Sequence, residues 1–185
     1  MTDAETQLAG FFARYEPAIA RLGKALRTKL RARLPGLSEI VYLYERQRSL
    51  VISYSPTEHG YQAVCTLALY PEQVKLFFAR GPLLSKADPN KLLRGTGKMV
   101  RYVPMDKAAD FDRAEIEALM VAALGLAKLR PAAGGERALI IKADEQRKRA
   151  TRTSKAASRA SPTQRKTTQR KTTQRQTSRP KTTRP

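Results

Sequence analysis

The sequence has a single cysteine, Cys65, no tryptophan and no long apolar run. One cysteine cannot close an internal disulfide, which excludes the small disulfide-stapled secreted scaffolds. No stretch of about eighteen apolar residues occurs, so we expect no membrane-spanning helix. The segment 1–7 lacks the positive start and the apolar run of a signal peptide. Together these absences favour a cytoplasmic protein.

Acidic residues are scarce, and one end of the chain has none. The 185 residues include 36 Lys and Arg but only 16 Asp and Glu, a net charge of +20. Residues 147–185 contain no acid and no apolar side chain except alanine. Burial there cannot offset a backbone ordering cost of about 1–2 kcal/mol per residue, so we predict disorder. The cations of this segment are Arg147, Lys148, Arg149, Arg152, Lys155, Arg159, Arg165, Lys166, Arg170, Lys171, Arg175, Arg179, Lys181 and Arg184.

The same segment contains a short repeat. Pro-Thr-Gln-Arg-Lys at 162–166 is followed by Thr-Thr-Gln-Arg-Lys at 167–171 and Thr-Thr-Gln-Arg-Gln at 172–176. A period of five matches neither helix nor strand periodicity, and we interpret it as a way of spacing cations along a flexible arm. The sequence therefore predicts a folded domain at 1–142 and a basic tail at 143–185.

The charge of the tail predicts its partner. Cations without acids create a field that attracts polyanions, and nine of the fourteen are arginines, whose planar guanidinium suits phosphate oxygens. Nothing in the repeat would read bases, so we predict sequence-nonspecific binding of DNA or RNA through phosphate contacts. A solubilising or unselected extension is the alternative. A membrane surface is less favoured because no apolar residue would anchor the segment.

The front of the chain begins with helical patterns. Phe11–Tyr15 end a short helix, and Pro17 suits the first position of the next, which Pro35-Gly36 stop. Its apolar stripe is Ile19, Leu22, Leu26, Leu30 and Leu34. Its cations form either a second basic surface or a solvated face paired with acids elsewhere. They are Arg21, Lys24, Arg27, Lys29, Arg31 and Arg33.

Strand-like segments rich in β-branched and aromatic residues follow, separated by short breakers. The short gaps favour antiparallel pairing. Alternation puts Leu50, Ile52 and Tyr54 on one face, and Val74, Leu76 and Phe78 likewise. The opposite positions, Val51, Ser53, Lys75 and Phe77, are mixed in character, so we expect helices on one face and partial solvation of the other. The segments are Ile40–Glu45, Leu50–Ser55, Tyr61–Tyr70, Val74–Ala79, Met99–Val103 and, as a candidate edge strand, Arg137–Lys142.

Two further helices are predicted. Asp88 as N-cap, Pro89 and the stop at Gly95 predict a small helix over Asn90–Arg94. A last helix is predicted to begin near Asp112, which has capping-box spacing with Glu115, and to end at Pro131 and the glycines at 134–135. Its stripe is Ile116, Leu119, Met120, Ala123 and Ala127. The whole pattern predicts an α+β fold, a two-layer sandwich with helices on one face of an antiparallel sheet of about five strands, followed by the disordered tail.

Several stretches resemble the YdhG-like family, a bacterial domain of largely unassigned function. They are Tyr15-Glu16-Pro17, the segments 67–71 and 74–78, the Leu92–Lys98 run with Val100-Arg101, and the last helix from Asp112 to about Leu129. The resemblance covers about residues 8–142. It implies a compact two-layer α/β domain similar in outline to frataxin, and some members are described as iron chaperones.

Chemical sites have weak signals. His59 and Cys65 would form a base and nucleophile only if the fold brought them together. The acids Asp106, Asp110, Asp112, Glu115 and Glu117 cluster in sequence, and hard cations take oxygen ligands, but acids are also expected near a helix start. We therefore predict no catalytic residue, no cofactor and no metal site.

A glycine turn gives a weak anion signal. Gly95-Thr96-Gly97-Lys98 suggests a P-loop, but Leu92 stands where the first Gly is needed and Met99 where Ser or Thr is needed. Exposed backbone N–H groups beside cations would still hold an anion, but a helix stop with a tight turn is the favoured explanation of the glycines. The candidate residues are Lys91, Arg94, Gly95, Gly97, Lys98 and Arg101.

Aromatic residues are the last candidates. Tyr42, Tyr44 and Phe77 would stack bases as in RNA-binding sheets. Because Val74–Gly81 lacks the glycine that this motif requires near its start, packing on a sheet face is favoured instead. The sequence thus predicts a non-enzymatic nucleic-acid binder that acts through its tail. The alternative is a domain that binds a small ligand or iron and carries an incidental tail.

Overall fold

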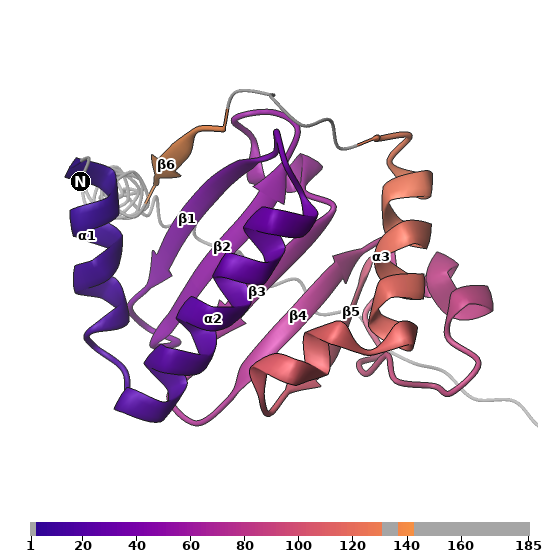
Figure 1. Ribbon diagram of the computed structural model, residues 1–185, viewed down its shortest axis with the longest axis horizontal. Coiled ribbons are helices and arrows are strands. Elements are labelled where there is room, and N and C mark those ends of the chain that lie inside the picture. Colours follow the sequence, from indigo (N-terminus) through magenta and orange to yellow (C-terminus); the bar gives the residue numbers. More distant parts are fainter. Residues whose placement is uncertain (1–2, 131–136, 143–185) are drawn as a thin grey trace, which may run out of the picture.

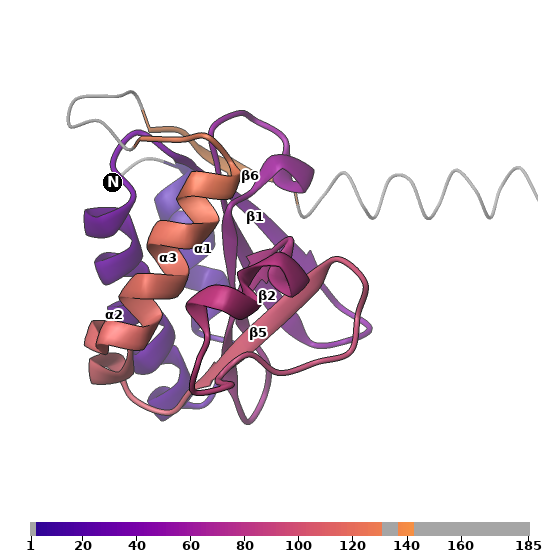
Figure 2. The same cartoon turned by 90° about the vertical axis from the view of Figure 1, so that its right-hand side faces the viewer.

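A computed structural model describes residues 3–130 and 137–142 of the chain. Three α-helices, α1 (Asp3–Phe12), α2 (Pro17–Arg33) and α3 (Ala114–Leu126), lie on one side of a six-stranded sheet (Figures 1 and 2). Three short 3-10 helices connect strands or precede α3, namely η1 (Gly60–Gln62), η2 (Gly81–Ala87) and η3 (Ala108–Asp112). The strands are β1 (Ser38–Tyr44), β2 (Ser49–Ser55), β3 (Cys65–Leu69), β4 (Val74–Ala79), β5 (Val100–Met105) and β6 (Leu139–Ile141).

The α+β class predicted from the sequence is confirmed, but the details of the sheet differ. The strand order is β5-β4-β3-β2-β1-β6, so the sheet has six strands where about five were predicted. The pairs from β1 to β5 are antiparallel, whereas β6 lies parallel to β1, with Glu39 opposite Leu139. The sheet is therefore mixed, because the chain returns to it after α3 beside its first strand rather than by a hairpin.

The core lies between the sheet and the helices, as the alternation predicts. Leu50, Ile52, Tyr54, Val74, Leu76 and Phe78 are all at most 1% exposed. From α2, Leu26 and Leu30 fill the other side of the same core. A Cβ on Gly23 would lie 2.5 Å from Leu69 Cδ2, so a glycine is needed where α2 crosses β3. The apolar stripe of α2 and one face of each central strand thus form a single cluster.

Three local predictions are wrong. Only Cys65–Leu69 of the expected strand Tyr61–Tyr70 pairs as β3, because η1 occupies its beginning. No helix forms over Asn90–Arg94: the Asp88 carboxylate accepts hydrogen bonds from the N–H groups of residues 92 and 93 in a turn. Lys91 has a φ of 53°, which a right-handed helix does not allow.

The last helix begins near Asp112 as predicted, but its expected capping by Asp112 is the third wrong prediction. The residue before the first turn of α3 is Arg113, not Asp112. Asp112 ends η3, and its carboxylate accepts a hydrogen bond from Lys29 Nζ at 2.7 Å. The predicted N-cap acid therefore joins α2 to this corner of the fold instead of capping a helix. The predicted stops at Pro131 and 134–135 lie outside the described residues.

The free edge of β5 is protected. Tyr102 exchanges two backbone hydrogen bonds with Arg94, at 2.7 and 3.1 Å, in an isolated bridge outside the strand. Pro104, two residues on and therefore facing the same way, has no N–H to donate. Both features block the pairing of a further strand with this edge.

A buried ion-pair network joins α1, α2 and β1. Arg27 donates to both Glu5 and Glu39, with closest contacts of 2.8 and 2.6 Å, and the side chain of Glu39 is only 1% exposed. Burial lowers the pKa of Arg27, but its hydrogen bonds to Glu5 and Glu39 outweigh that effect and raise it overall. The hydrogen bond from Arg27 holds the pKa of Glu5 below its usual value. Arg27 and Glu5 therefore stay charged at neutral pH.

Among the described residues, no helix is both long enough and apolar enough to cross a membrane.

Truncation of the α2 stripe should test the core. Leu30 is fully buried, whereas Leu83 in η2 is 64% exposed. We expect Leu30→Ala to lower the free energy of unfolding by about 2–5 kcal/mol, and the matched Leu83→Ala to change it by less than about 0.5 kcal/mol. Urea titration of each variant measures the difference. Similar losses for both would show that α2 does not pack as described.

The buried ion pair makes a second prediction. Glu39→Gln should lower the free energy of unfolding by about 2 kcal/mol at neutral pH, because Arg27 loses its charged partner within the fold. The control is Glu45→Gln, since the Arg14–Glu45 pair is 52% and 66% exposed and should contribute less than about 1 kcal/mol. Urea unfolding measures the free energy of unfolding of both variants. An equal loss in the two would show that the buried network contributes no more than an exposed ion pair.

Candidate functional site

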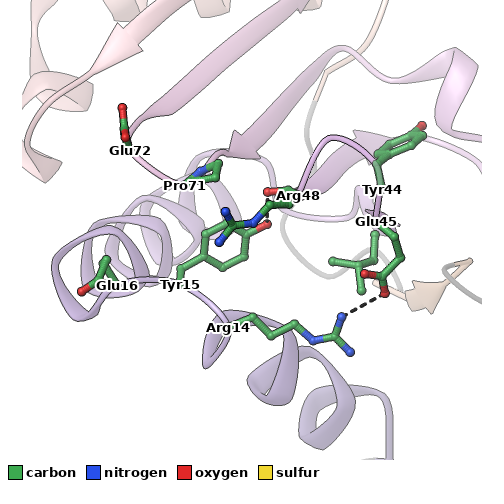
Figure 3. Close-up of a pocket in the computed structure, with 9 residues that line it drawn as sticks. Arg14, Tyr15, Glu16, Tyr44, Glu45, Arg48, Pro71 and Glu72 are labelled. Carbon is green, nitrogen blue, oxygen red and sulfur yellow. Dashed lines mark hydrogen bonds and ion pairs between the residues drawn. The ribbon is translucent and has the colours of Figure 1, made fainter.

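A hollow of about 440 Å³ lies where the α1–α2 connection meets the β1–β2 and β3–β4 turns (Figure 3). Its volume falls in the range of small-ligand sites. It is lined by Arg14, Tyr15, Glu16, Leu43, Tyr44, Glu45, Arg48, Pro71 and Glu72. Three connections that are far apart in sequence thus form one site, and no spacing in the sequence signals it.

Its geometry is held by two contacts. Arg14 Nη1 lies 3.0 Å from Glu45 Oε1, and the Tyr15 hydroxyl donates to the backbone oxygen of Arg48 at 3.1 Å (Figure 3). Arg48 has a φ of 48°, so the β1–β2 turn places it in the left-handed region. Burial, the largest effect, raises the pKa of Tyr15, which therefore stays a neutral donor.

The charges of this hollow do not suit a polyanion. Three carboxylates line it, from Glu16, Glu45 and Glu72, against two guanidinium groups. Neither Cys65 nor His59 is among its lining residues, so it has no base and nucleophile of the predicted kind. This mixture of charges fits a small polar ligand that contacts the Tyr15 ring.

A second candidate is the sheet face that points away from the three helices (Figure 2). Lys75 Nζ lies 5.0 Å from the centre of the Tyr70 ring and 4.5 Å from that of Tyr102. The Phe77 and Tyr102 rings are 5.3 Å apart, and Tyr42 and Tyr44 stack at 6.1 Å on β1. The predicted trio of Tyr42, Tyr44 and Phe77 is thus on one face, but in two separate groups.

The predicted anion loop has an exposed glycine turn, but one of its cations bonds to the loop itself. Gly95 has a φ of 98°, as a glycine turn requires, and Lys91, Arg94, Gly97 and Lys98 are exposed. Arg101, however, donates to the backbone oxygens of Gly97 and Val100. Its guanidinium therefore holds the turn together and is already bonded to carbonyl groups.

The basic face of α2 is largely paired with acids. Arg27 and Arg31 contact Glu5, Lys29 contacts Asp112, and Arg33 contacts Glu117 at 2.6 Å. The hydrogen bond from Arg33 lowers the pKa of Glu117. Lys24 lies over the Phe12 ring, at 5.8 Å from its centre. Of the two interpretations left open by the sequence, the geometry favours the paired, solvated face over a second basic surface.

Cys65 and His59 do not form a catalytic pair. Cys65 is 1% exposed within β3, and burial raises its pKa to about 12. His59 lies in the loop before η1, where its ring stacks on Tyr61 at 5.3 Å. A buried neutral thiol of this kind behaves as a small apolar side chain.

The acids near η3 and α3 do not converge. Asp110 accepts from the backbone N–H groups of Asp106 and Lys107, while Asp112 and Glu117 face cations of α2. Glu115 contacts Arg113 and Asn90. In the part of the chain that the structure describes, no group of three His, Cys, Asp or Glu side chains is placed to hold a metal ion.

The fourteen predicted phosphate contacts, from Arg147 to Arg184, lie outside the described residues. Comparison of the chain with protein-family models, with curated proteins and with solved structures yields no match.

Two features of the fold were not predicted from the sequence. The hollow at Tyr15 and Arg48 depends on three connections that meet only in the fold. The Tyr70–Lys75–Tyr102 cluster was partly predictable, because alternation placed Lys75 and Phe77 on the open face of the sheet. The position of Tyr102 beside them depends on how β5 pairs with β4, which the sequence does not show.

The burial of Cys65 makes a simple prediction, because the chain has no other thiol. At mildly alkaline pH the folded protein should react with a thiol reagent at least about a hundredfold more slowly than the unfolded chain, since only the thiolate attacks. Absorbance of the released chromophore, with and without denaturant, gives both rates. Fast reaction in the folded protein would restore Cys65 as a nucleophile candidate.

Proposed function

We propose that the chain is a non-enzymatic, sequence-nonspecific nucleic-acid binder whose tail contacts phosphates. The observation that carries this proposal is the composition of residues 147–185, with fourteen cations and no acid. Each neutralised phosphate releases counterions, which drives association and makes it depend on salt.

Most carboxylates of the described residues already have partners within the domain, which supports a partner for the tail outside the chain. Eight of those described already accept hydrogen bonds within the domain. They are Glu5, Glu39, Glu45, Asp88, Asp110, Asp112, Glu115 and Glu117.

Five described carboxylates accept no side-chain hydrogen bond and form no ion pair within residues 3–130 and 137–142. They are Asp3, Glu16, Glu58, Glu72 and Asp106. Even if these five and the three acids outside the described residues, Glu136, Asp144 and Glu145, all paired with the tail, six of its fourteen cations would have no carboxylate partner. A polyphosphate backbone provides the counter-charges that the domain lacks.

The test keeps the full chain and changes only the tail charge. A variant with all fourteen tail Lys and Arg replaced by Gln has the same length and repeat spacing. We expect it to bind a random-sequence duplex at least about a hundredfold more weakly than the natural chain at moderate salt. Its log–log salt slope should also be flatter, by about 0.9 for each phosphate that the tail no longer neutralises. Fluorescence anisotropy against salt concentration measures both.

A chain ending at Gln146 should behave like the neutral-tail variant. If either altered chain binds the duplex as tightly as the natural one, the tail has no such role and the proposal is wrong.

The second candidate function is small-ligand binding by the domain, and the hollow at Tyr15 and Arg48 favours it. The absence of a converging acid group among the described residues gives iron no special support over other ligands. The resemblance to the YdhG-like family stays a prediction. Saturable binding of a small ligand, equal in the natural and neutral-tail chains, would favour this candidate.

A further inference from the structure

The face of the sheet opposite the helices presents aromatic rings in neighbouring strands. The register places Phe77 of β4 opposite Tyr102 of β5, and Lys75 opposite Pro104. These positions alternate with Leu76 and Val103, which are buried under the helices. Tyr70, Lys75, Phe77 and Tyr102 are therefore on the other face, where each is half-buried and none is covered by α1, α2 or α3.

The charge on this face is positive and has no carboxylate partner. Lys75 stands between the Tyr70 and Tyr102 rings and forms no ion pair within residues 3–130 and 137–142. The contact with two ring faces directs its ammonium group and leaves its charge unneutralised. The paired cations of α2 differ in this respect, since carboxylates of the fold already neutralise them.

Further cations border the same rings. The backbone of Arg94 is hydrogen-bonded to that of Tyr102 in both directions, and a Cβ on Gly95 would lie 3.5 Å from the Tyr102 ring. The loop that carries Lys91, Arg94 and Lys98 thus lies against the aromatic cluster. Like Lys75, these three side chains form no ion pair among the described residues.

We propose that this face, formed by Tyr70, Lys75, Phe77 and Tyr102 with the 91–98 loop beside it, binds single-stranded nucleic acid through base stacking. Unpaired bases would stack on the exposed parts of the rings, and the cations would contact the adjacent phosphates. A duplex hides its base faces, so it would gain only the phosphate contacts. The inference rests on the proposed function and adds to it a substrate class that the tail alone does not select.

The experiment uses the full chain and three labelled probes of about twelve nucleotides, a length within the span of one binding groove. They are oligo-thymidine, an abasic strand with the same phosphates, and a duplex. At one moderate salt concentration we expect the thymidine strand to bind about tenfold or more tightly than the abasic strand. Fluorescence anisotropy gives the three affinities.

Variants test whether the tighter binding of the thymidine strand, relative to the abasic strand, depends on this face of the sheet. Tyr102→Leu should remove most of this gain in affinity, while Tyr102→Phe, which keeps the ring, should retain it. The matched control is Tyr61→Leu, because Tyr61 is 81% exposed and stacks on His59 outside the cluster. Lys75→Met should weaken binding more than Lys86→Met, which removes one exposed charge from η2.

A measurement on the natural chain covers the case in which Tyr102→Leu does not fold. Ultraviolet cross-linking to a halogenated single strand, followed by peptide mapping, should mark the segments 70–77 or 94–102. Cross-links confined to other segments would overturn the inference.

The two proposals fail in different ways. Equal affinity of the natural chain for thymidine and abasic strands, or an unchanged gain in Tyr102→Leu, would overturn base stacking on this face. Binding to the abasic strand and the duplex that does not depend on the tail charge would instead overturn the proposed function.

Discussion

The structure depends most on one buried arginine. Arg27 of α2 contacts Glu5 of α1 and Glu39 of β1, so a single guanidinium joins both N-terminal helices to the sheet. Because Glu39 is almost fully buried, removing either Arg27 or Glu39 would leave the other charge without this partner inside the fold. The contact also aligns α2 over β3, where Gly23 allows the close approach to Leu69.

Acidic and basic side chains of the chain differ in how many of them find partners within the domain. The domain uses its carboxylates internally, on α2 cations, turns and backbone N–H groups. Several other cations of the described residues form no ion pair there, among them Lys75, Lys91, Arg94 and Lys98. Positive charge is therefore directed outward by the fold, and we infer that its counter-charge comes from another molecule.

Elements whose apolar periodicity is strong could be predicted from the sequence. The alternation of β4 matched its burial, because the solvent-excluded side of a strand follows a fixed period. Leu26 and Leu30 of the α2 stripe are buried as predicted. In β2 the predicted positions 50, 52 and 54 are buried, but Ser49, Ser53 and Ser55 on the other face are buried as well. The expected helix at Asn90–Arg94 failed because the Asp88 side chain satisfied two backbone N–H groups within a turn. Asp112 failed as an N-cap because Lys29, 83 positions away, competed for its carboxylate.

By itself, the sequence determined the α+β class and the burial of one face of each central strand, because these follow from local periodicity. It also distinguished a C-terminal segment whose charged residues are all basic, because that follows from composition. Only the tertiary structure decided that β6 pairs parallel to β1, that the α2 cations are matched by acids, and that Lys75 lies between two tyrosines. Those outcomes depend on which distant segments meet, and contact energies between residues far apart in the chain have no signature in local spacing.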